Sequence, residues 1–352
     1  MTTIPVPAPP SLRERLRALP KTELHVHLLG ALRPATVVDL ARAKGAPVLA
    51  AAERAAAEGW RFTDLPAFVE TFIGLFGLVT TAAEFERATA EVLEDLADLG
   101  VRYAEIRLTP TSHLSRGATL EGMWAGLEAA RRAAEVRRGI VARWIVDFPR
   151  GLPLEVAERA CDVAIATRDR GTVGFDVAGD ERAVGASPAF GAVFARARAA
   201  GLVPLAHAGE AAGPESVRAA LDLYGAVRIG HGTRAVEDPA LLARLALEQV
   251  ALEVCPTSNV RLNVVRSVAE HPVRAFLAAG VPVVVSSDDP SLFGTDIVAE
   301  HEALHLEAGI PLATLGAISA ASFDRALLPA KERNDLLGVA RRQALAWAAA
   351  SE

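Results

Sequence analysis

Eight short apolar runs alternate with longer stretches of helical periodicity along this chain. Nearly continuous runs of Val, Ile and Leu are typical of parallel strands that are buried on both faces. Between them, apolar residues recur at helical spacing, as in 82–100 before the second run and 238–249 before the seventh. The runs cover residues 23–28, 101–108, 141–148, 172–178, 202–208, 226–231, 250–256 and 281–287.

This alternation predicts an α/β fold, a single (β/α)8 TIM barrel. The 352 residues suffice for one large barrel or two ordinary domains, but no Pro-, Gly- or Ser-rich linker divides the eight repeats. The stretch between the first two runs is long for a barrel loop, which predicts extra helices there. We expect residues 1–20 to form an N-terminal arm and a lead-in helix, and residues 21–352 to form the barrel.

Polar residues stand where the predicted strands end. In (β/α)8 barrels the C-terminal ends of the strands, and the loops after them, carry the chemistry. A single polar residue at a strand end is more often a structural cap or a buried residue whose hydrogen bonds are satisfied within the core. Polar groups at so many strand ends predict a shared cavity. These residues are His25, His27, Glu105, Arg107, Asp147, Asp176, His207, Glu210, His231, the turn 255–259, Asp288 and Asp289.

Two of these residues, His25 and His27, project to the same side of the first strand, because strand side chains alternate. Inward-facing imidazoles are costly unless each finds a partner. His207 and Asp288 belong to the fifth and eighth strands and can reach the same point across the barrel. Three imidazole nitrogens and one carboxylate oxygen suit Zn²⁺, with a position left for water. We therefore expect one zinc ion per chain.

Glu210, His231 and Asp289 are the candidate catalytic and binding partners of this metal. Zinc lowers the pKa of the water that it binds and so supplies a nucleophile. Glu210 can deliver a proton to the substrate, and His231 can hold and deprotonate the attacking water. Asp289 can accept a hydrogen bond from the substrate, beside Asp288, which we count as catalytic as well as metal-binding.

Composition narrows the class of partner. The formal charge of −6 and the lack of a dense basic cluster argue against nucleic acid and against an anionic membrane, so a small molecule is the expected partner. Cys161 and Cys255 are far apart and form no CxxC motif, which argues for a reduced, cytoplasmic protein. The N-terminal segment lacks the features of a signal peptide, and no apolar run is long enough for a membrane span. A homo-oligomer stays open.

Lysines are too rare to bridge two metals. The chain has only Lys21, Lys44 and Lys331, and none of them falls within a predicted strand. We therefore do not expect a two-metal site bridged by a carboxylated lysine.

A second segment of the sequence resembles a zinc-binding motif. Residues 301–305 read HEALH, which fits the HExxH signature of zinc proteases. The extended form of that signature fails, because Ala308 and Pro311 stand where its glycine and third histidine belong. We expect these histidines on an outer helix, facing solvent or a neighbouring subunit.

Seven segments, in order along the chain, resemble the adenosine deaminase family of the amidohydrolase superfamily. They read LPKTELHVHL, RYAEIRLTP, GFDVAGDE, HAGE, RIGHGT, LEVCPTSN and SSDDP. The resemblance implies the same four zinc ligands and a hydrolytic deaminase, which converts the 6-amino group of a purine to a 6-oxo group and releases ammonia. It implies that Glu210 protonates ring nitrogen 1, that His231 orients the water, that Asp289 contacts nitrogen 7 and that the backbone of Gly179 contacts nitrogen 3.

Leu29 departs from this pattern. Adenosine-specific members of the family carry an acidic residue there, near the ribose 5′-hydroxyl. A leucine forgoes that hydrogen bond and favours a nucleoside with an apolar or extended 5′ group. The segments TPTSHLSRG and RWIVDFP are similar to the aminofutalosine deaminase branch, whose nucleoside carries a keto-benzoate chain on its 5′ carbon. Arg107, Arg116 or Arg261 could meet that carboxylate.

A phenylalanine stripe lies between the first two predicted strands. Phe68, Phe72 and Phe76 recur every four residues, which places them on one helical face. Such a stripe usually belongs to the core, whereas the resemblance implies an apolar cover near the ribose.

The leading prediction is a zinc-dependent deaminase of adenosine or a 5′-modified adenosine such as aminofutalosine. The alternatives are a deaminase of adenine or another aminoheterocycle such as a pterin, a non-catalytic binding barrel and, more remotely, an HExxH protease.

Overall fold

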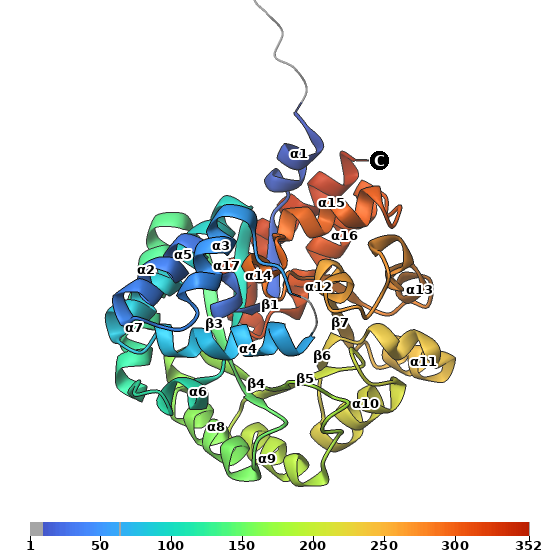
Figure 1. Cartoon of the computed structure of the whole chain (residues 1–352). Helices are drawn as coiled ribbons and strands as arrows, with labels where there is room; N and C mark the ends of the chain where they lie inside the picture. The colour runs from blue at the N-terminus through green and yellow to red at the C-terminus, as the bar shows by residue number, and fades with distance from the viewer. Residues whose placement is uncertain (1–9, 63–64, 352) are drawn as a thin grey trace, which may run out of the picture.

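Eight parallel strands form one barrel in the computed structural model of the chain, which describes residues 10–62 and 65–351 (Figure 1). Each strand pairs with the next in chain order, and a bridge between Val26 and Asp288 joins the first strand to the segment after the eighth. The predicted TIM barrel is confirmed. The strands are β1 (Lys21–His27), β2 (Val101–Leu108), β3 (Val141–Pro149), β4 (Thr172–Ala178), β5 (Val203–Ala208), β6 (Arg228–His231), β7 (Ala251–Val254) and β8 (Val283–Val285).

Helices surround the barrel and cover its mouth. The extra helices expected between the first two strands are α2 (Pro34–Lys44), α3 (Leu49–Glu58) and α4 (Leu65–Leu75), and α4 lies across the barrel opening in Figure 1. The others are α1 (Leu12–Ala18), α5 (Ala82–Asp98), α6 (Pro110–Leu114), α7 (Leu120–Arg138), α8 (Leu154–Ala166), α9 (Pro188–Ala199), α10 (Pro214–Ala219), α11 (Pro239–Leu247), α12 (Pro256–Arg261), α13 (Val273–Ala278), α14 (Pro290–Phe293), α15 (Ile297–Leu306), α16 (Leu312–Ser322) and α17 (Ala330–Ala349).

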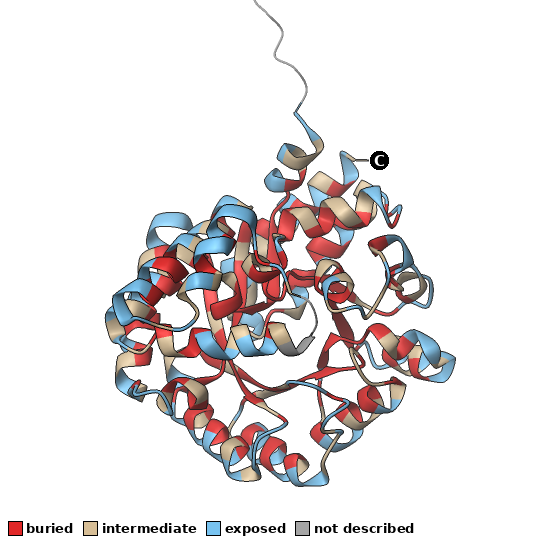
Figure 2. Ribbon diagram, viewed as in Figure 1, coloured by how far each residue is buried: buried red, intermediate tan, exposed pale blue. Residues whose placement is uncertain are grey.

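The outer helices bury one face against the sheet and expose the other, as the red and blue faces in Figure 2 show. Helix α5 is an example. It begins at a capping box, in which Thr81 accepts a hydrogen bond from the Glu84 amide and Glu84 accepts one from the Thr81 amide. Its inner face buries Phe85 and Val92. Local capping and helical periodicity thus agree with the packing.

The first strand begins earlier than predicted, at Lys21, so the expectation that no lysine lies in a strand was wrong. Lys21 is buried, and its ammonium donates hydrogen bonds of 2.7 Å to the carbonyls of Leu16, Leu19 and Leu99. These contacts hold it at the N-terminal end of β1, whereas His25 and His27 lie toward the other end. Burial lowers the pKa of this lysine to about 7.

The predicted N-terminal arm falls largely on residues 1–9, which lie outside the described residues, and α1 follows it. Within the described residues, no helix combines the length and the apolar character that a bilayer crossing needs.

Candidate metal centre and active site

The four predicted ligands, His25, His27, His207 and Asp288, come together at the C-terminal ends of their strands. One ligand atom from each lies within 4.8 Å of the others, and all four residues are buried. Asp288 Oδ1 lies 3.4 Å from Nε2 of both His25 and His27. Three histidines and one carboxylate form a donor set that Zn²⁺ accepts.

Several buried polar atoms around this cluster have no hydrogen-bond partner among the described residues. They include His25 Nε2, Asp147 Oδ2, Glu210 Oε1 and Asp289 Oδ1. Because buried polar groups in native proteins are nearly always satisfied, these atoms indicate that an ion and a polar ligand belong here. The residues therefore fit the metal that the sequence predicts.

Two site residues adopt a left-handed backbone, which is uncommon outside glycine. His231 and Asp288 each have a φ of 63°. The Asp288 carboxylate also accepts a hydrogen bond from Ser258 at 2.7 Å, which fixes its direction. Such strained positions concentrate at functional sites, where the surrounding contacts hold them in place.

Two glycines permit the close approach of neighbouring segments to site residues. A Cβ on Gly230 would lie 2.8 Å from the ring of His25, and a Cβ on Gly30 would lie 1.7 Å from Asp289 Oδ1. Gly230 in RIGHGT therefore leaves the space that His25 occupies, and Gly30 in HVHLLG leaves the space that Asp289 occupies.

The buried guanidinium of Arg107 bridges two carboxylates, and each carboxylate lies against one histidine of the predicted ligand set. His25 Nδ1 lies 2.9 Å from Glu253, and His207 Nδ1 lies 3.1 Å from Asp176. Arg107 donates to both carboxylates, at 2.8 Å to Asp176 and 2.6 Å to Glu253. Carboxylates in this position orient a metal-binding imidazole and fix its tautomer. Arg107 is therefore fully engaged inside the barrel, which excludes it as a contact for a substrate carboxylate.

Glu105 also lies away from the cavity expected at the strand ends. Its carboxylate pairs with Arg228 and accepts hydrogen bonds from Tyr103 Oη at 2.8 Å and from the Leu327 amide at 2.7 Å. The expectation that Glu105 faces the cavity was wrong, because this carboxylate is neutralised deeper in the barrel.

Glu210 and His231 lie close together beside the ligand cluster. Glu210 Oε1 is 3.7 Å from His231 Nε2, and His231 Nδ1 is 3.3 Å from the side-chain nitrogen of Asn259. Burial raises the pKa of Glu210 to about 8 and lowers that of His231 to about 4. A carboxyl and an imidazole in contact are suited to give and take a proton.

The site opens into a cavity of about 1020 Å³. Its lining includes the site residues His27, His207, Glu210, His231, Asp288, Asp289 and Gly179. Phe68, Phe72 and Phe76 also line it, and the Phe72 ring lies 6.0 Å from that of His27. The phenylalanine stripe is thus both a packed face and a pocket wall.

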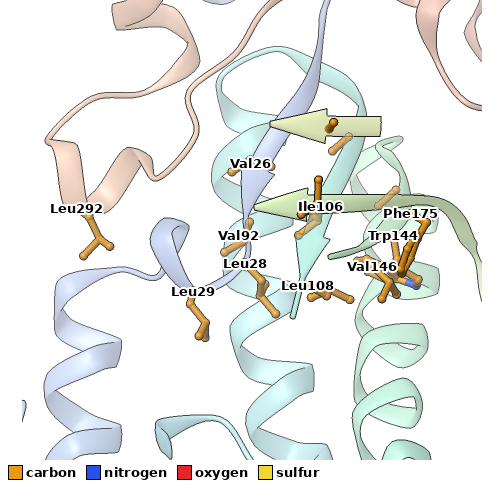
Figure 3. Close-up of a cluster of buried hydrophobic side chains, with 14 of the residues drawn as sticks. Val26, Leu28, Leu29, Val92, Ile106, Leu108, Trp144, Val146, Phe175 and Leu292 are labelled. Carbon is orange, nitrogen blue, oxygen red and sulfur yellow. The ribbon is translucent and has the colours of Figure 1, made fainter. Parts of the chain in front are cut away.

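Two residues considered for substrate contacts lie outside this lining. Leu29 is 3% exposed and belongs to the hydrophobic cluster drawn in Figure 3, just beyond the end of β1. Among the described residues that line the cavity, neither Leu29 nor Arg261 occurs. Arg261 instead donates to the Phe293 carbonyl at 3.2 Å.

A family model described as adenosine deaminase matches residues 20–341. The chain belongs to the adenosine deaminase family. It is similar to the aminodeoxyfutalosine deaminase of Streptomyces coelicolor, with 42% identity over 83% of this chain and 76% of that protein. The adenine deaminase of Rhodospirillum rubrum is 40% identical over 83% of this chain and 88% of its own length.

Among solved structures, an amidohydrolase from Burkholderia ambifaria with bound Zn is similar, with a TM-score of 0.87 and 28% identity. The match covers 99% of this chain and 96% of that one. Family membership and these deaminase relatives make the protein a hydrolase that acts on a carbon–nitrogen bond, a deaminase.

In this member of the adenosine deaminase family, HEALH is a structural segment of α15. His301 Nδ1 bonds the Ile297 carbonyl at 2.7 Å, and His305 Nδ1 bonds the Ile310 carbonyl at 2.8 Å. His301 is buried, so the expectation that both histidines face outward was wrong for it. In the described part of the chain, the ligand cluster of β1, β5 and Asp288 is the only group of residues arranged to hold a metal.

Two acidic residues beside this site, Glu253 and Glu181, were not predicted from the sequence. Glu253 stands in LEVCP, inside an apolar strand, where an acidic residue is itself the signal of a buried partner. Glu181 ends GFDVAGDE and is 3% exposed. Four of its five hydrogen bonds come from backbone amides, which no side-chain motif can reveal, and the fifth comes from Ser216 Oγ.

Proposed function

We propose that this deaminase acts on an adenine nucleoside whose 5′ end carries an aryl carboxylate, as aminodeoxyfutalosine does, and that it uses one Zn²⁺ held by His25, His27, His207 and Asp288. The observation that carries the proposal is the cavity. Pockets of about 300–1,000 Å³ bury ligands of drug size, and this one measures about 1020 Å³. That space exceeds the need of a bare purine and suits a nucleoside with a long 5′ extension.

The walls of the cavity carry apolar side chains that the protein itself leaves uncovered. Val69 and Ile73 of α4 are 39% and 47% exposed, and Leu152, before α8, is 45% exposed. Large apolar side chains exposed around one cavity typically mark a binding surface. An aromatic ring of the substrate would cover them.

Two arginines supply a counter-charge for a carboxylate. Arg116 Nη1 bonds the Ser112 carbonyl at 2.9 Å and Ser115 Oγ at 3.3 Å, and no acidic partner of Arg116 occurs among the described residues. Arg159 of α8 likewise forms no ion pair in the described part of the chain, although Glu155 shares the lining with it. By contrast, the cavity arginines Arg182 and Arg234 are each paired with an acidic neighbour.

The residues nearest the proposed metal ligands each have a separate role in the reaction. When bound, Zn²⁺ supplies a nucleophile at neutral pH by lowering the pKa of its water. His231 would orient the attacking water and take its proton, while Glu210 would protonate ring nitrogen 1 as the oxygen bonds to carbon 6. The bond from carbon 6 to the amino nitrogen then breaks. The nitrogen takes up the proton that His231 accepted and leaves as ammonia, while the new 6-hydroxyl returns a proton to Glu210 and becomes the 6-oxo group. Asp289 and the backbone of Gly179, which both line the cavity, hold nitrogens 7 and 3.

A side-by-side assay tests the substrate. Loss of the adenine absorbance is followed with adenosine, adenine, 5′-methylthioadenosine and aminodeoxyfutalosine. We expect kcat/KM to be highest for aminodeoxyfutalosine, by about 10- to 100-fold over adenosine, the value of one charge-assisted contact. Equal values for the two nucleosides would contradict the proposal.

The arginine variants test the carboxylate contact itself. Arg116→Gln and Arg159→Gln are each expected to raise KM for aminodeoxyfutalosine about 10-fold and to leave adenosine turnover unchanged. Arg42→Gln, which removes an exposed ion pair with Glu53, is the matched control. Equal losses on both substrates would show that these arginines do not read the carboxylate.

Adenine deamination is the second candidate, because the adenine deaminase of Rhodospirillum rubrum is 40% identical to this chain over 83% of its length. In that case adenine would outrank every nucleoside in the assay. The metal ligands, Glu210 and His231 would keep their roles.

A further inference from the structure

Glu181 is the most heavily hydrogen-bonded carboxylate beside the active site, and no part of the proposed chemistry uses it. It follows β4, two residues after Gly179, and is 3% exposed. One oxygen, Oε2, accepts from the backbone amides of Glu210, Ala211 and Ala212 at 2.9–3.0 Å. The other, Oε1, accepts from the Gly209 amide at 2.9 Å and from Ser216 Oγ at 2.7 Å.

These four consecutive amides belong to the loop between β5 and α10, the loop that carries Glu210. Successive backbone N–H groups turn toward one point only when the loop is curled, and Gly209 supplies a left-handed turn with φ of 67°. The Gly209 amide is buried and the other three are half-buried, so without an acceptor each would cost up to about 1–3 kcal/mol. The carboxylate of Glu181 is therefore what holds the loop in this shape.

The loop shape determines where the Glu210 side chain goes. Glu181 binds the amide of Glu210 itself and the amides on both sides of it, so the direction of its Cα–Cβ bond is fixed. The Glu210 carboxylate enters the cavity, 3.7 Å from His231. A misplacement of about 1 Å can cost a reaction about 100-fold in rate.

We propose that Glu181 is the positioning residue of Glu210, the proton donor, and that it works through the backbone of the 209–212 loop. The proposal rests on the role given to Glu210 in the proposed function. Glu181 also joins two walls of the site, since Gly179 on its own loop and Glu210 on the other both line the cavity. Arg150, which is 4.0 Å from Glu181 and donates to the His207 carbonyl at 2.5 Å, balances its charge.

The loop that carries Gly179 is also held by hydrogen bonds that do not involve Glu181. Asp180 accepts a hydrogen bond from the Arg182 amide at 2.9 Å, and its carbonyl accepts one from the Val184 amide at 3.2 Å. Loss of Glu181 should therefore disturb the Glu210 loop more than the base contact at Gly179. We expect a fall in kcat with little change in KM.

The test is a double-mutant cycle of Glu181→Gln and Glu210→Gln, assayed with whichever nucleoside the wild-type enzyme turns over fastest. Gln at 181 places an NH₂ group against amide donors and cannot accept all five hydrogen bonds. We expect kcat to fall about 10- to 100-fold, KM to stay within about threefold and the zinc content to be unchanged. In the Glu210→Gln background, Glu181→Gln should slow turnover no further, because it acts through Glu210.

Two control variants separate positioning from general damage. Glu84→Gln removes a carboxylate that likewise accepts from two backbone amides, those of Thr80 and Thr81, outside the cavity lining. Ser216→Ala removes one of the five hydrogen bonds to Glu181 without touching the Glu210 amide. Both are expected to keep kcat within about twofold of the wild type.

The outcomes distinguish this proposal from the proposed function. Wild-type kcat in Glu181→Gln, or an additive loss in the double variant, would overturn the positioning role. Should Glu181→Gln fail to fold, Glu181→Asp keeps the charge on a shorter side chain, and a wild-type kcat there would overturn the role equally. Wild-type turnover in Glu210→Gln would instead remove the proton donor and with it the proposed function.

Discussion

Val26 and Asp288 form the parallel bridge that closes the barrel. The Asp288 amide donates to the His25 carbonyl at 2.8 Å, and the His27 amide donates to the Asp288 carbonyl at 2.9 Å. Three residues of the proposed ligand set are therefore neighbours in one short ladder between the first strand and the end of the last. An ion bound to their side chains ties together the same two edges that the backbone joins.

Removal of the metal should therefore lower the thermal stability of the whole barrel. A ligand bound about 1,000-fold above its Kd stabilises by about 4 kcal/mol, so a chelator should lower Tm by about 5–10 °C. His207→Ala, which already lacks one ligand, should show a lower Tm that the chelator hardly changes. Scanning calorimetry with and without dipicolinate measures both, and an unchanged wild-type Tm would argue against a structural contribution of the metal.

Glu210→Gln should keep the metal and lose turnover. The amide has the same shape but carries no transferable proton, so kcat should fall about 10²- to 10⁴-fold. Glu237→Gln is the matched control, because this carboxylate also lines the cavity but is paired with Arg234. Metal analysis and steady-state kinetics decide the outcome, and loss of zinc with loss of rate would point to a ligand role instead.

How far the sequence predicts this site depends on the range of each contact. The alternation of one strand suffices to place His25 and His27 on the same side, and the order of the strands suffices to bring His207 and Asp288 to them. Whether a polar side chain near the end of a strand reaches the cavity or stays inside the barrel is harder to predict. Glu105 and Arg107 belong to one strand, yet both are neutralised inside the barrel by partners far away in the chain.

Leu29 illustrates the same limit. The family resemblance implies that Leu29 lies near the substrate. Phe72 and Phe76 pack over this segment, and Leu29 lies among apolar side chains, next to a void of about 10 Å³. Burial here depends on a helix more than 35 positions away, which no local motif contains. An acidic residue in its place would be a buried charge rather than a new hydrogen-bond partner.

Arg107→Met should weaken both the fold and the metal site. Arg107 is 1% exposed and neutralises Asp176 and Glu253, so its loss leaves two buried carboxylates without a cation and should cost about 3–5 kcal/mol. Since those carboxylates orient His207 and His25, zinc affinity should fall about 10- to 100-fold. Urea unfolding and chelator competition measure the two effects.

A matched control for Arg107 is Arg42→Met, which removes an ion pair with Glu53 that is exposed to solvent. That change should alter the free energy of unfolding by no more than about 0.5 kcal/mol. Arg107→Lys keeps the charge but offers no planar fork to bridge two carboxylates. If it restored zinc affinity fully, the bridge would be irrelevant and only the charge would matter.

Glu300 should make the stability of the protein depend on pH. It is fully buried and accepts hydrogen bonds from Thr295 Oγ1 at 2.6 Å and from the Thr257 amide at 3.0 Å. Burial raises its pKa to about 7, from 4.5 for a free side chain. The folded state therefore keeps a proton that the unfolded state releases near pH 4.5. The resulting stabilisation is fully present below pH 4.5 and is lost as the pH rises through 7.

Glu300→Gln mimics the protonated acid at every pH, so the free energy of unfolding of the wild type relative to this variant should fall by up to about 3 kcal/mol between pH 5 and pH 8. Glu302→Gln, on the same helix, controls for the loss of one carboxylate and should show no such trend. Urea unfolding at pH 5, 6, 7 and 8 supplies the four points for each protein. A constant difference between the wild type and Glu300→Gln would mean that Glu300 stays ionised in the fold and that its hydrogen bonds outweigh the cost of burial.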